Sequence, residues 1–148
     1  MIFICDVMLG KLARYLRMLG LDAPYIRKGE PALPPPGEGQ HYFFTKSAAK
    51  KGRPGAIFVH SDDPRKQVLE IKEHIRPYID PAAFMTRCLE CNVRLVAVKK
   101  VDIEPLVPEY VYHHHDAFKA CPSCRRVYWE GSHADEMNIW IKMVMGDR

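Results

Sequence analysis

The sequence lacks any hydrophobic run of about 18 residues, the length that a membrane-spanning helix needs. Its N-terminus also lacks the charged and then apolar pattern of a secretion signal. One proline-rich stretch is of low complexity, and no internal repeat is visible apart from two cysteine pairs. These absences argue against a membrane or secreted protein, so we expect the chain to be soluble and cytoplasmic.

The composition is that of a globular protein. With 47% hydrophobic, 27% charged and 10% aromatic residues, the chain is neither mainly disordered nor collagen-like. Its 148 residues suit one ordinary domain, or one small domain with an appended module. Twenty-two basic against eighteen acidic side chains give a net charge of +4, which is compatible with a polyanionic partner but does not require one.

Strand and helix patterns alternate over residues 1–84. Short apolar runs predict strands at residues 2–5, 42–45 and 56–60. Apolar residues spaced three and four apart predict a helix between Leu9 and Gly20, and Asp63 before a proline predicts the start of another. The proline-rich residues 31–39 predict a loop. Such alternation is typical of an α/β fold, a parallel sheet with flanking helices.

The pattern changes near Pro81, and we expect residues 85–148 to form a second unit after the α/β domain of residues 1–84. Strand-like runs occur at residues 93–98 and 127–129. A terminal helix is predicted to begin near Ser132, where Ser132 and Asp135 resemble a capping box. The second unit is therefore expected to be a small β-rich module with a C-terminal helix.

Four of the five cysteines form two CxxC pairs, Cys88 with Cys91 and Cys121 with Cys124. Four thiolates in two tight turns make a closed tetrahedral set for Zn²⁺, so the sequence predicts a structural zinc. The 29 residues between the pairs leave room for a β-hairpin. Buried or redox thiols and an iron–sulfur cluster are the alternatives. Cys5, alone in an apolar strand, is expected to be inert.

Histidines form a second group of potential ligands. His113, His114 and His115 precede Asp116, but neighbours in a strand point to opposite faces, so the three cannot bind one ion from a strand. We expect them to be solvated or packed in the core, and His133 to be a structural hydrogen-bonding residue.

Three aspartates follow predicted strands. Asp6 comes directly after the first strand, and Asp62 and Asp63 come after the third. Because the carboxyl ends of parallel strands share one edge of a sheet, these carboxylates are candidates to hold Mg²⁺ or Mn²⁺ for phosphodiester hydrolysis. The alternative is helix capping, for which Asp63 is well placed.

Basic side chains accompany these acidic residues. They lie in the first predicted helix and after the second predicted strand: Lys11, Arg14, Arg17, Lys46, Lys50, Lys51 and Arg53. Such a set could form a rim that binds RNA phosphates, or a solvated surface without a ligand.

Residues 3–20, which contain the first strand, Asp6 and the basic helix, closely resemble the opening of the Mut-seven C-terminal RNase family. Later matching segments are residues 61–64, 87–92, 115–116, 121–124 and 127–133. The resemblance implies a PIN-like fold followed by a zinc ribbon, and a metal-dependent RNase activity with RNA as the partner.

The chain departs from the family pattern at two places. The proline-rich loop replaces an acidic helix and leaves only Glu30 and Glu38, and Ser47 stands where the family has an aspartate. Two hypotheses follow: a weak Mg²⁺- or Mn²⁺-dependent endoribonuclease using Asp6, Asp62 and Asp63, or a catalytically degenerate RNA- or protein-binding module with a structural zinc. A zinc-ribbon adaptor without a nucleic-acid role is a third alternative.

Overall fold

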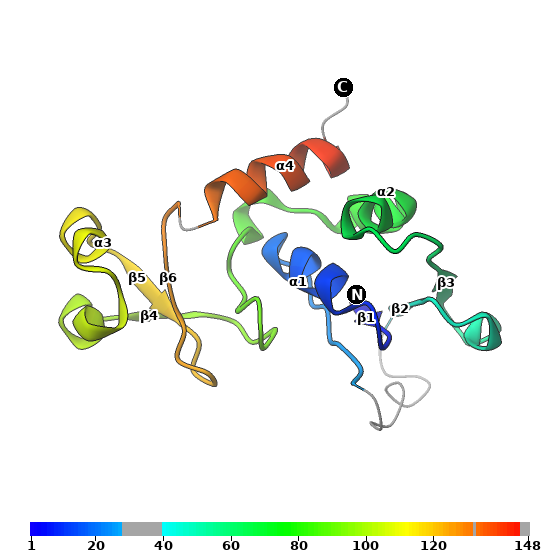
Figure 1. The fold of residues 1–148 in the computed structure, drawn as a ribbon, viewed down its shortest axis with the longest axis horizontal. Coiled ribbons are helices and arrows are strands. Elements are labelled where there is room, and N and C mark those ends of the chain that lie inside the picture. The colour runs from blue at the N-terminus through cyan, green and yellow to red at the C-terminus, as the bar shows by residue number, and fades with distance from the viewer. Residues whose placement is uncertain (28–39, 132, 146–148) are drawn as a thin grey trace.

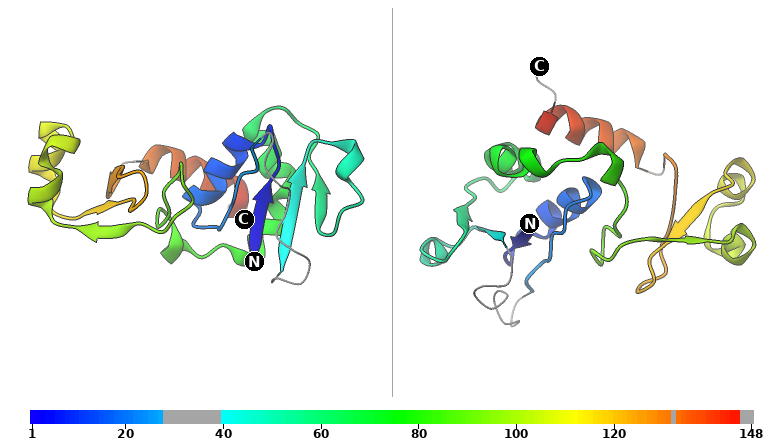
Figure 2. Two further views of the ribbon diagram at one scale, coloured as in Figure 1. Left: turned by 90° about the horizontal axis from the view of Figure 1, so that it is seen from below. Right: turned by 180° about the vertical axis from the view of Figure 1, so that it is seen from behind.

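The computed structural model describes residues 1–27, 40–131 and 133–145. The predicted loop at residues 31–39 lies outside the described residues, as do Glu30, Glu38 and Ser132. Two three-stranded sheets make up the β-structure of the described residues, one parallel and one antiparallel. Figures 1 and 2 show them at opposite ends of an elongated molecule, with helices between them.

The parallel sheet has the strand order β1 (Ile2–Cys5), β2 (His41–Thr45) and β3 (Ala56–Phe58). Residues 22–26 run along the edge of β1 that does not face β2. Backbone hydrogen bonds hold them there, such as that from the Cys5 amide to the Pro24 carbonyl (2.8 Å). Because β1 is paired on both edges, its apolar run is almost fully buried. The third strand ends at Phe58 rather than at residue 60 as predicted.

Two helices follow the predicted pattern, α1 (Gly10–Met18) and α2 (Pro64–Ile75). The side chain of Asp63 accepts a hydrogen bond from the Arg65 amide and caps α2, as its sequence suggested. Gly20 ends α1 with a φ of +83°, and a side chain there would collide with the backbone of Ala83. A short 3₁₀ helix, η1 (Ala48–Lys50), follows β2.

The antiparallel sheet is a meander of three short strands: β4 (Val96–Val98), β5 (Phe118–Ala120) and β6 (Val127–Trp129). The connection between β4 and β5 holds a 3₁₀ helix, η4 (Lys100–Leu106), and an α-helix, α3 (Glu109–His114). Two further 3₁₀ helices, η2 (Arg76–Tyr78) and η3 (Pro81–Ala83), lead from α2 to this part of the chain. The sequence predicted neither α3 nor β5, and it placed the start of β4 too early.

The terminal helix α4 (Ala134–Met145) turns back from the meander and lies against α1 and α2 (Figures 1 and 2). The ring of Trp140 lies over Tyr15 with centroids 3.9 Å apart, and Arg76 donates a hydrogen bond to the Val144 carbonyl (3.1 Å). One hydrophobic core thus includes residues from both sides of residue 84. The predicted domain boundary after residue 84 stays a prediction.

The predicted fold class is confirmed: a mixed α/β chain with a parallel sheet, flanking helices, a cysteine-containing β module and a terminal helix. Within the described residues, no helix combines the length and the apolar composition needed to cross a membrane.

Candidate metal centre and strand-end site

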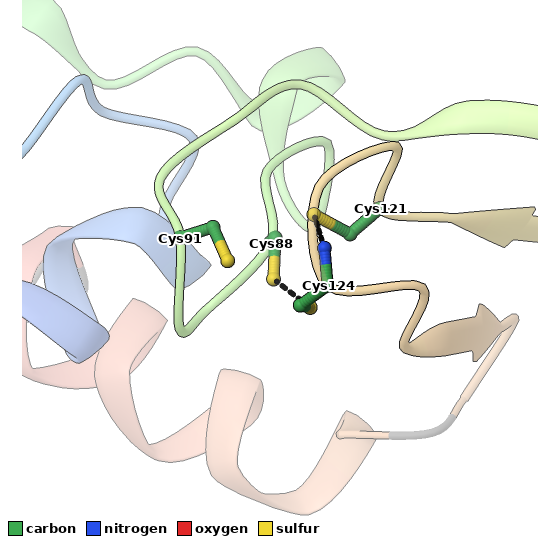
Figure 3. Close-up of side chains that lie close together, drawn as sticks. All are labelled: Cys88, Cys91, Cys121 and Cys124. Atoms are coloured by element: carbon green, nitrogen blue, oxygen red, sulfur yellow. Dashed lines mark hydrogen bonds between the residues drawn. The ribbon is translucent and has the colours of Figure 1, made fainter.

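The four cysteines of the two CxxC pairs converge, as Figure 3 shows. Their sulfur atoms all lie within 4.8 Å of one another, and the Sγ atoms of Cys88 and Cys124 are 3.6 Å apart. Tetrahedral zinc with Zn–S bonds of about 2.3 Å separates its sulfurs by about 3.8 Å. The donor set and its spacing therefore fit a metal ion such as Zn²⁺.

The two cysteine turns have the same local geometry. The Asn92 amide donates to the Cys88 carbonyl and the Arg125 amide to the Cys121 carbonyl, each at 2.9 Å. Asn92 and Arg125 have positive φ values of 65° and 67°, which tighten the turns so that both sulfurs of a pair face inward. Repetition of this geometry brings four thiols to one point.

The four thiols differ in acidity: burial and the neighbouring thiols raise the pKa of Cys91 to about 12, and burial also raises the pKa of Cys124. Burial alone raises the pKa of the Cys121 thiol, but the amides of Cys124 and Ser123 donate to its sulfur and lower the pKa to about 7. The Tyr128 hydroxyl lies 3.5 Å from the Cys88 sulfur and accepts a hydrogen bond from the Leu89 amide (3.1 Å). Sequence reasoning missed this tyrosine, because nothing in its spacing links it to the first pair.

The first cysteine turn is docked on the α/β unit. Arg17 donates to the carbonyl oxygens of Leu89 (2.9 Å) and Ala23 (3.0 Å). The Asn92 side chain accepts from the Ala23 amide (2.9 Å) and donates to Asp22 (2.7 Å). Arg17 is therefore buried at this junction, with its guanidinium bound to two carbonyl oxygens. Its predicted part in RNA binding stays a prediction.

Asp6 lies at the carboxyl end of β1 and is 1% exposed. One carboxylate oxygen accepts from the Val7 amide (2.8 Å) and the other from the Thr45 hydroxyl (2.7 Å). The ammonium of Lys50 lies 3.0 and 3.1 Å from the two oxygens. Burial alone would raise the pKa of Asp6, but these hydrogen bonds and the Lys50 charge lower it. The carboxylate is thus ionised and already fully hydrogen-bonded.

The other two aspartates are engaged separately. Asp62 pairs with Lys46 at 2.7 Å, and this hydrogen bond and charge lower the pKa of Asp62. Lys46 also donates to the carbonyls of His60 (3.1 Å) and Ser61 (3.0 Å), so it ties the ends of β2 and β3 together. Asp63 caps α2.

A divalent cation does not fit this arrangement of carboxylates. In the part of the chain that the structure describes, only the four cysteines form a group of three or more potential ligands with converging donor atoms. Asp6, Asp62 and Asp63 do not form such a group. Each oxygen of Asp6 already accepts two hydrogen bonds, one of them from the Lys50 ammonium.

The remaining predicted RNA-binding side chains lie at the surface. Lys11 is exposed, and Arg14 is partly exposed and 3.7 Å from Glu90. The Lys51 ammonium lies 4.2 Å from the centroid of the Phe58 ring.

Two of the three adjacent histidines lie on a helix, and His115 follows it in an extended conformation, with its ring near those of Phe118 and Trp129. His113 and His114 form the last turn of α3, where they contact Glu109 (3.7 Å) and the Tyr110 carbonyl (2.7 Å). Both are exposed, which matches the expectation of solvated histidines.

Fold and site together define a class of protein: an α/β unit with a buried aspartate at the end of a strand, followed by a β module with four converging thiols. The chain belongs to the Mut7-C RNAse domain family, whose model matches residues 1–141. No curated protein and no solved structure matches it. The family description names an RNase domain, so membership suggests RNA as the substrate class.

Proposed function

We propose that this chain is an RNA-binding member of the Mut7-C RNAse domain family in which a lysine has replaced the catalytic cation. The family supports RNA as the ligand, and the contact of the Lys50 ammonium with both oxygens of Asp6 supports the replacement. The PIN-like fold that the resemblance implies belongs to the same proposal.

The chemistry of Mg²⁺ supports this choice. Mg²⁺ needs near-octahedral oxygen ligands and is usually held by more than one carboxylate or by carboxylate and phosphate together. Here Asp62 is paired with Lys46, Asp63 caps a helix, and Ser47 offers a hydroxyl in place of the expected carboxylate. A cation would have to displace Lys50 to reach Asp6.

The same lysines favour RNA binding without a metal. Free carboxylates at a strand-end site repel a phosphate backbone unless a cation neutralises them. Lys46 and Lys50 neutralise Asp62 and Asp6 directly, so phosphates meet no uncompensated negative charge at these two groups. Lys51 beside them adds a further positive charge.

We also infer that the four cysteines hold one structural Zn²⁺, since a closed set of four thiolates leaves no coordination position for a substrate. Cysteines that bind a metal and do not pair in disulfides are typical of a reducing compartment, which supports a cytoplasmic location.

A metal-dependent endoribonuclease is the second candidate function. It is favoured by the position of Asp6, which lies directly after β1 at the edge where sites of parallel sheets form.

Fluorescence anisotropy with labelled single-stranded RNA tests the proposal on the zinc-loaded chain at low salt. We expect RNA to bind without any divalent cation, no gain in affinity when Mg²⁺ or Mn²⁺ is added, and no cleavage of the RNA over the same period. Cleavage that needs Mn²⁺ and is lost in Asp6→Asn would support the second candidate. Absence of RNA binding at low salt would overturn the proposed function.

A further inference from the structure

Two hollows adjoin between α1 and the cysteine turns. One, of about 310 Å³, is lined by the start of α1, by Tyr25 and Arg27, and by Leu89. The other, of about 470 Å³, is lined by the second cysteine turn, by β6 and by Leu106. Arg14, Leu89 and Glu90 line both, so the two hollows adjoin at these side chains, and we call the two together a groove between α1 and the cysteine turns.

The groove is strongly cationic. Its basic side chains at or near the surface come from three segments that are distant in the sequence: Lys11, Arg14, Arg27, Arg125 and Arg126. We call this set the arginine groove. Among the described residues that line it, Glu90 is the acidic one, and it lies 3.7 Å from Arg14. Arg17 also lines the groove, but its guanidinium is bound to two carbonyl oxygens.

The start of α1 adds to this positive charge. Gly10 and Lys11 line the groove, the first turn of α1 contains no acidic residue, and no side chain caps it. The positive end of the helix dipole therefore lies beside the lysine and arginine side chains.

Aromatic side chains line both hollows of the groove. Tyr25 lines the first hollow, where its ring lies near Gly10, and Tyr128 and Trp129 line the second. A charged track with aromatic rings along it is the usual form of a site for single-stranded nucleic acid, in which phosphates contact arginines and splayed bases stack on rings. The bases of a duplex are paired and cannot reach such rings.

We propose that the arginine groove is the binding track for single-stranded RNA, with phosphates at Arg14, Arg125 and Arg126 and a base beside Trp129. This inference rests on the proposed RNA binding and gives it a place between the start of α1 and the second cysteine turn. It also gives the metal-binding module a role beyond folding, since the second cysteine turn fixes Arg125 and Arg126 beside α1.

The test compares two double variants with equal loss of charge. Arg125→Gln/Arg126→Gln removes two groove charges, and Lys99→Gln/Lys142→Gln removes two exposed charges that line neither hollow. Affinity for a single-stranded RNA of about 12 nucleotides is measured by anisotropy over a range of salt concentrations. We expect the groove variant to bind at least tenfold more weakly. The slope of the logarithm of the binding constant against the logarithm of the salt concentration should fall in magnitude by about 1.4, because each of the two lost phosphate contacts releases about 0.7 counterions. The control should keep the wild-type slope.

Glu90→Gln supplies a gain-of-function arm. Loss of this carboxylate removes a charge that repels phosphate and competes for Arg14, so we expect tighter RNA binding. A damaged fold cannot produce a tighter complex. If the groove variant loses zinc, Glu90→Gln therefore still tests whether RNA binds in the groove.

The outcomes separate the two proposals. If the wild type binds RNA but the groove variant behaves like its control and Glu90→Gln binds no more tightly, the groove is refuted and the proposed function stands. If the wild type binds no RNA at low salt, the proposed function itself fails. Equal affinity for duplex and single-stranded RNA would also refute the groove, because stacking needs unpaired bases.

Discussion

The guanidinium of Arg17 donates a 2.9 Å hydrogen bond to the carbonyl oxygen of Leu89, which lies between Cys88 and Cys91 of the four-cysteine cluster. Its Nε also donates to the Ala23 carbonyl. Burial lowers the pKa of Arg17, although nearby thiols and Glu90 act in the opposite direction. A buried side chain of α1 thus helps to hold the first cysteine turn in place, together with the hydrogen bonds of Asn92.

Replacement of Arg17 by lysine should destabilise the zinc-loaded chain. A lysine keeps the charge, but its single ammonium group cannot bond to both carbonyl oxygens as the planar guanidinium does. We therefore expect the free energy of unfolding to fall by about 2 kcal/mol. Urea unfolding measures it. Arg14→Lys, on the same helix but partly exposed, is the matched control and should change stability by less than about 0.5 kcal/mol. Equal effects of the two substitutions would contradict the prediction.

Metal removal should unfold the β module before the α/β unit. One equivalent of zinc is expected per chain, and the strands around the site have a small core formed by Ile103, Val111 and Phe118. The fluorescence of the two tryptophans reports on the two parts separately. Trp129 lies on β6 of the β module, and Trp140 lies on α4 against Tyr15 of the α/β unit.

With a chelator, Trp140→Phe protein should show a large change in the fluorescence of Trp129, and Trp129→Phe protein a smaller change in that of Trp140. Less than half an equivalent of zinc in freshly purified protein would count against the zinc assignment.

Local patterns account for what the sequence predicted correctly. The apolar run of β1, the three- and four-residue spacing in α1, and Asp63 before Pro64 each act within a few residues, and each element formed where expected. The same holds for the metal centre, because a CxxC turn brings its own two sulfurs together.

Tertiary contacts explain what the sequence could not predict. Arg17 stands on the charged face of α1, and only the docking of a distant cysteine turn buries it. The pairing of Lys50 with Asp6 likewise depends on the parallel register of β1 and β2. Residues 109–114 are rich in aromatic and β-branched types, yet they form α3, since a helix places Val111 in the small core of the module.

Acidification should remove the stability that Asp6 contributes. Its folded-state pKa lies below the ordinary value of about 3.9, so the contribution is complete above that value and is lost as the pH falls through the folded-state pKa. Asp6→Asn should cost about 2 kcal/mol at neutral pH, through the weakened bonds to Lys50 and Thr45.

Urea unfolding of the wild type and Asp6→Asn at several pH values between about 6 and 3 measures the difference. Acid releases zinc from both proteins, so only the difference between them reports on Asp6. A difference that stays constant down to the lowest pH would show that the carboxylate charge contributes nothing.

Cys5 should not react with thiol reagents in the folded protein. Its side chain is fully buried in β1, and burial raises the pKa of its thiol to about 12, against the smaller effect of the Arg17 charge. Labelling of the zinc-loaded chain, read by mass spectrometry of peptides, should modify Cys5 only after denaturant is added. Rapid modification under native conditions would mean that β1 opens.

Removal of the Lys50 ammonium, together with restoration of a carboxylate, should create a cation site. Ser47 is close to Asp6, since its amide donates to the Thr45 hydroxyl that itself binds Asp6 (3.0 and 2.7 Å). In Lys50→Gln/Ser47→Asp, two carboxylates would face the space that the ammonium fills.

We expect Mn²⁺ to bind to this double variant at least tenfold more tightly than to the wild type, a difference of about 1.4 kcal/mol in binding free energy. The paramagnetic resonance signal of free Mn²⁺ measures this binding. Lys51→Gln/Ser47→Ala, with the same loss of a lysine, should bind no better than the wild type. If the wild type already binds Mn²⁺ as tightly as the double variant, Lys50 does not hold the place of a cation, and the metal-dependent ribonuclease becomes the better description of this chain.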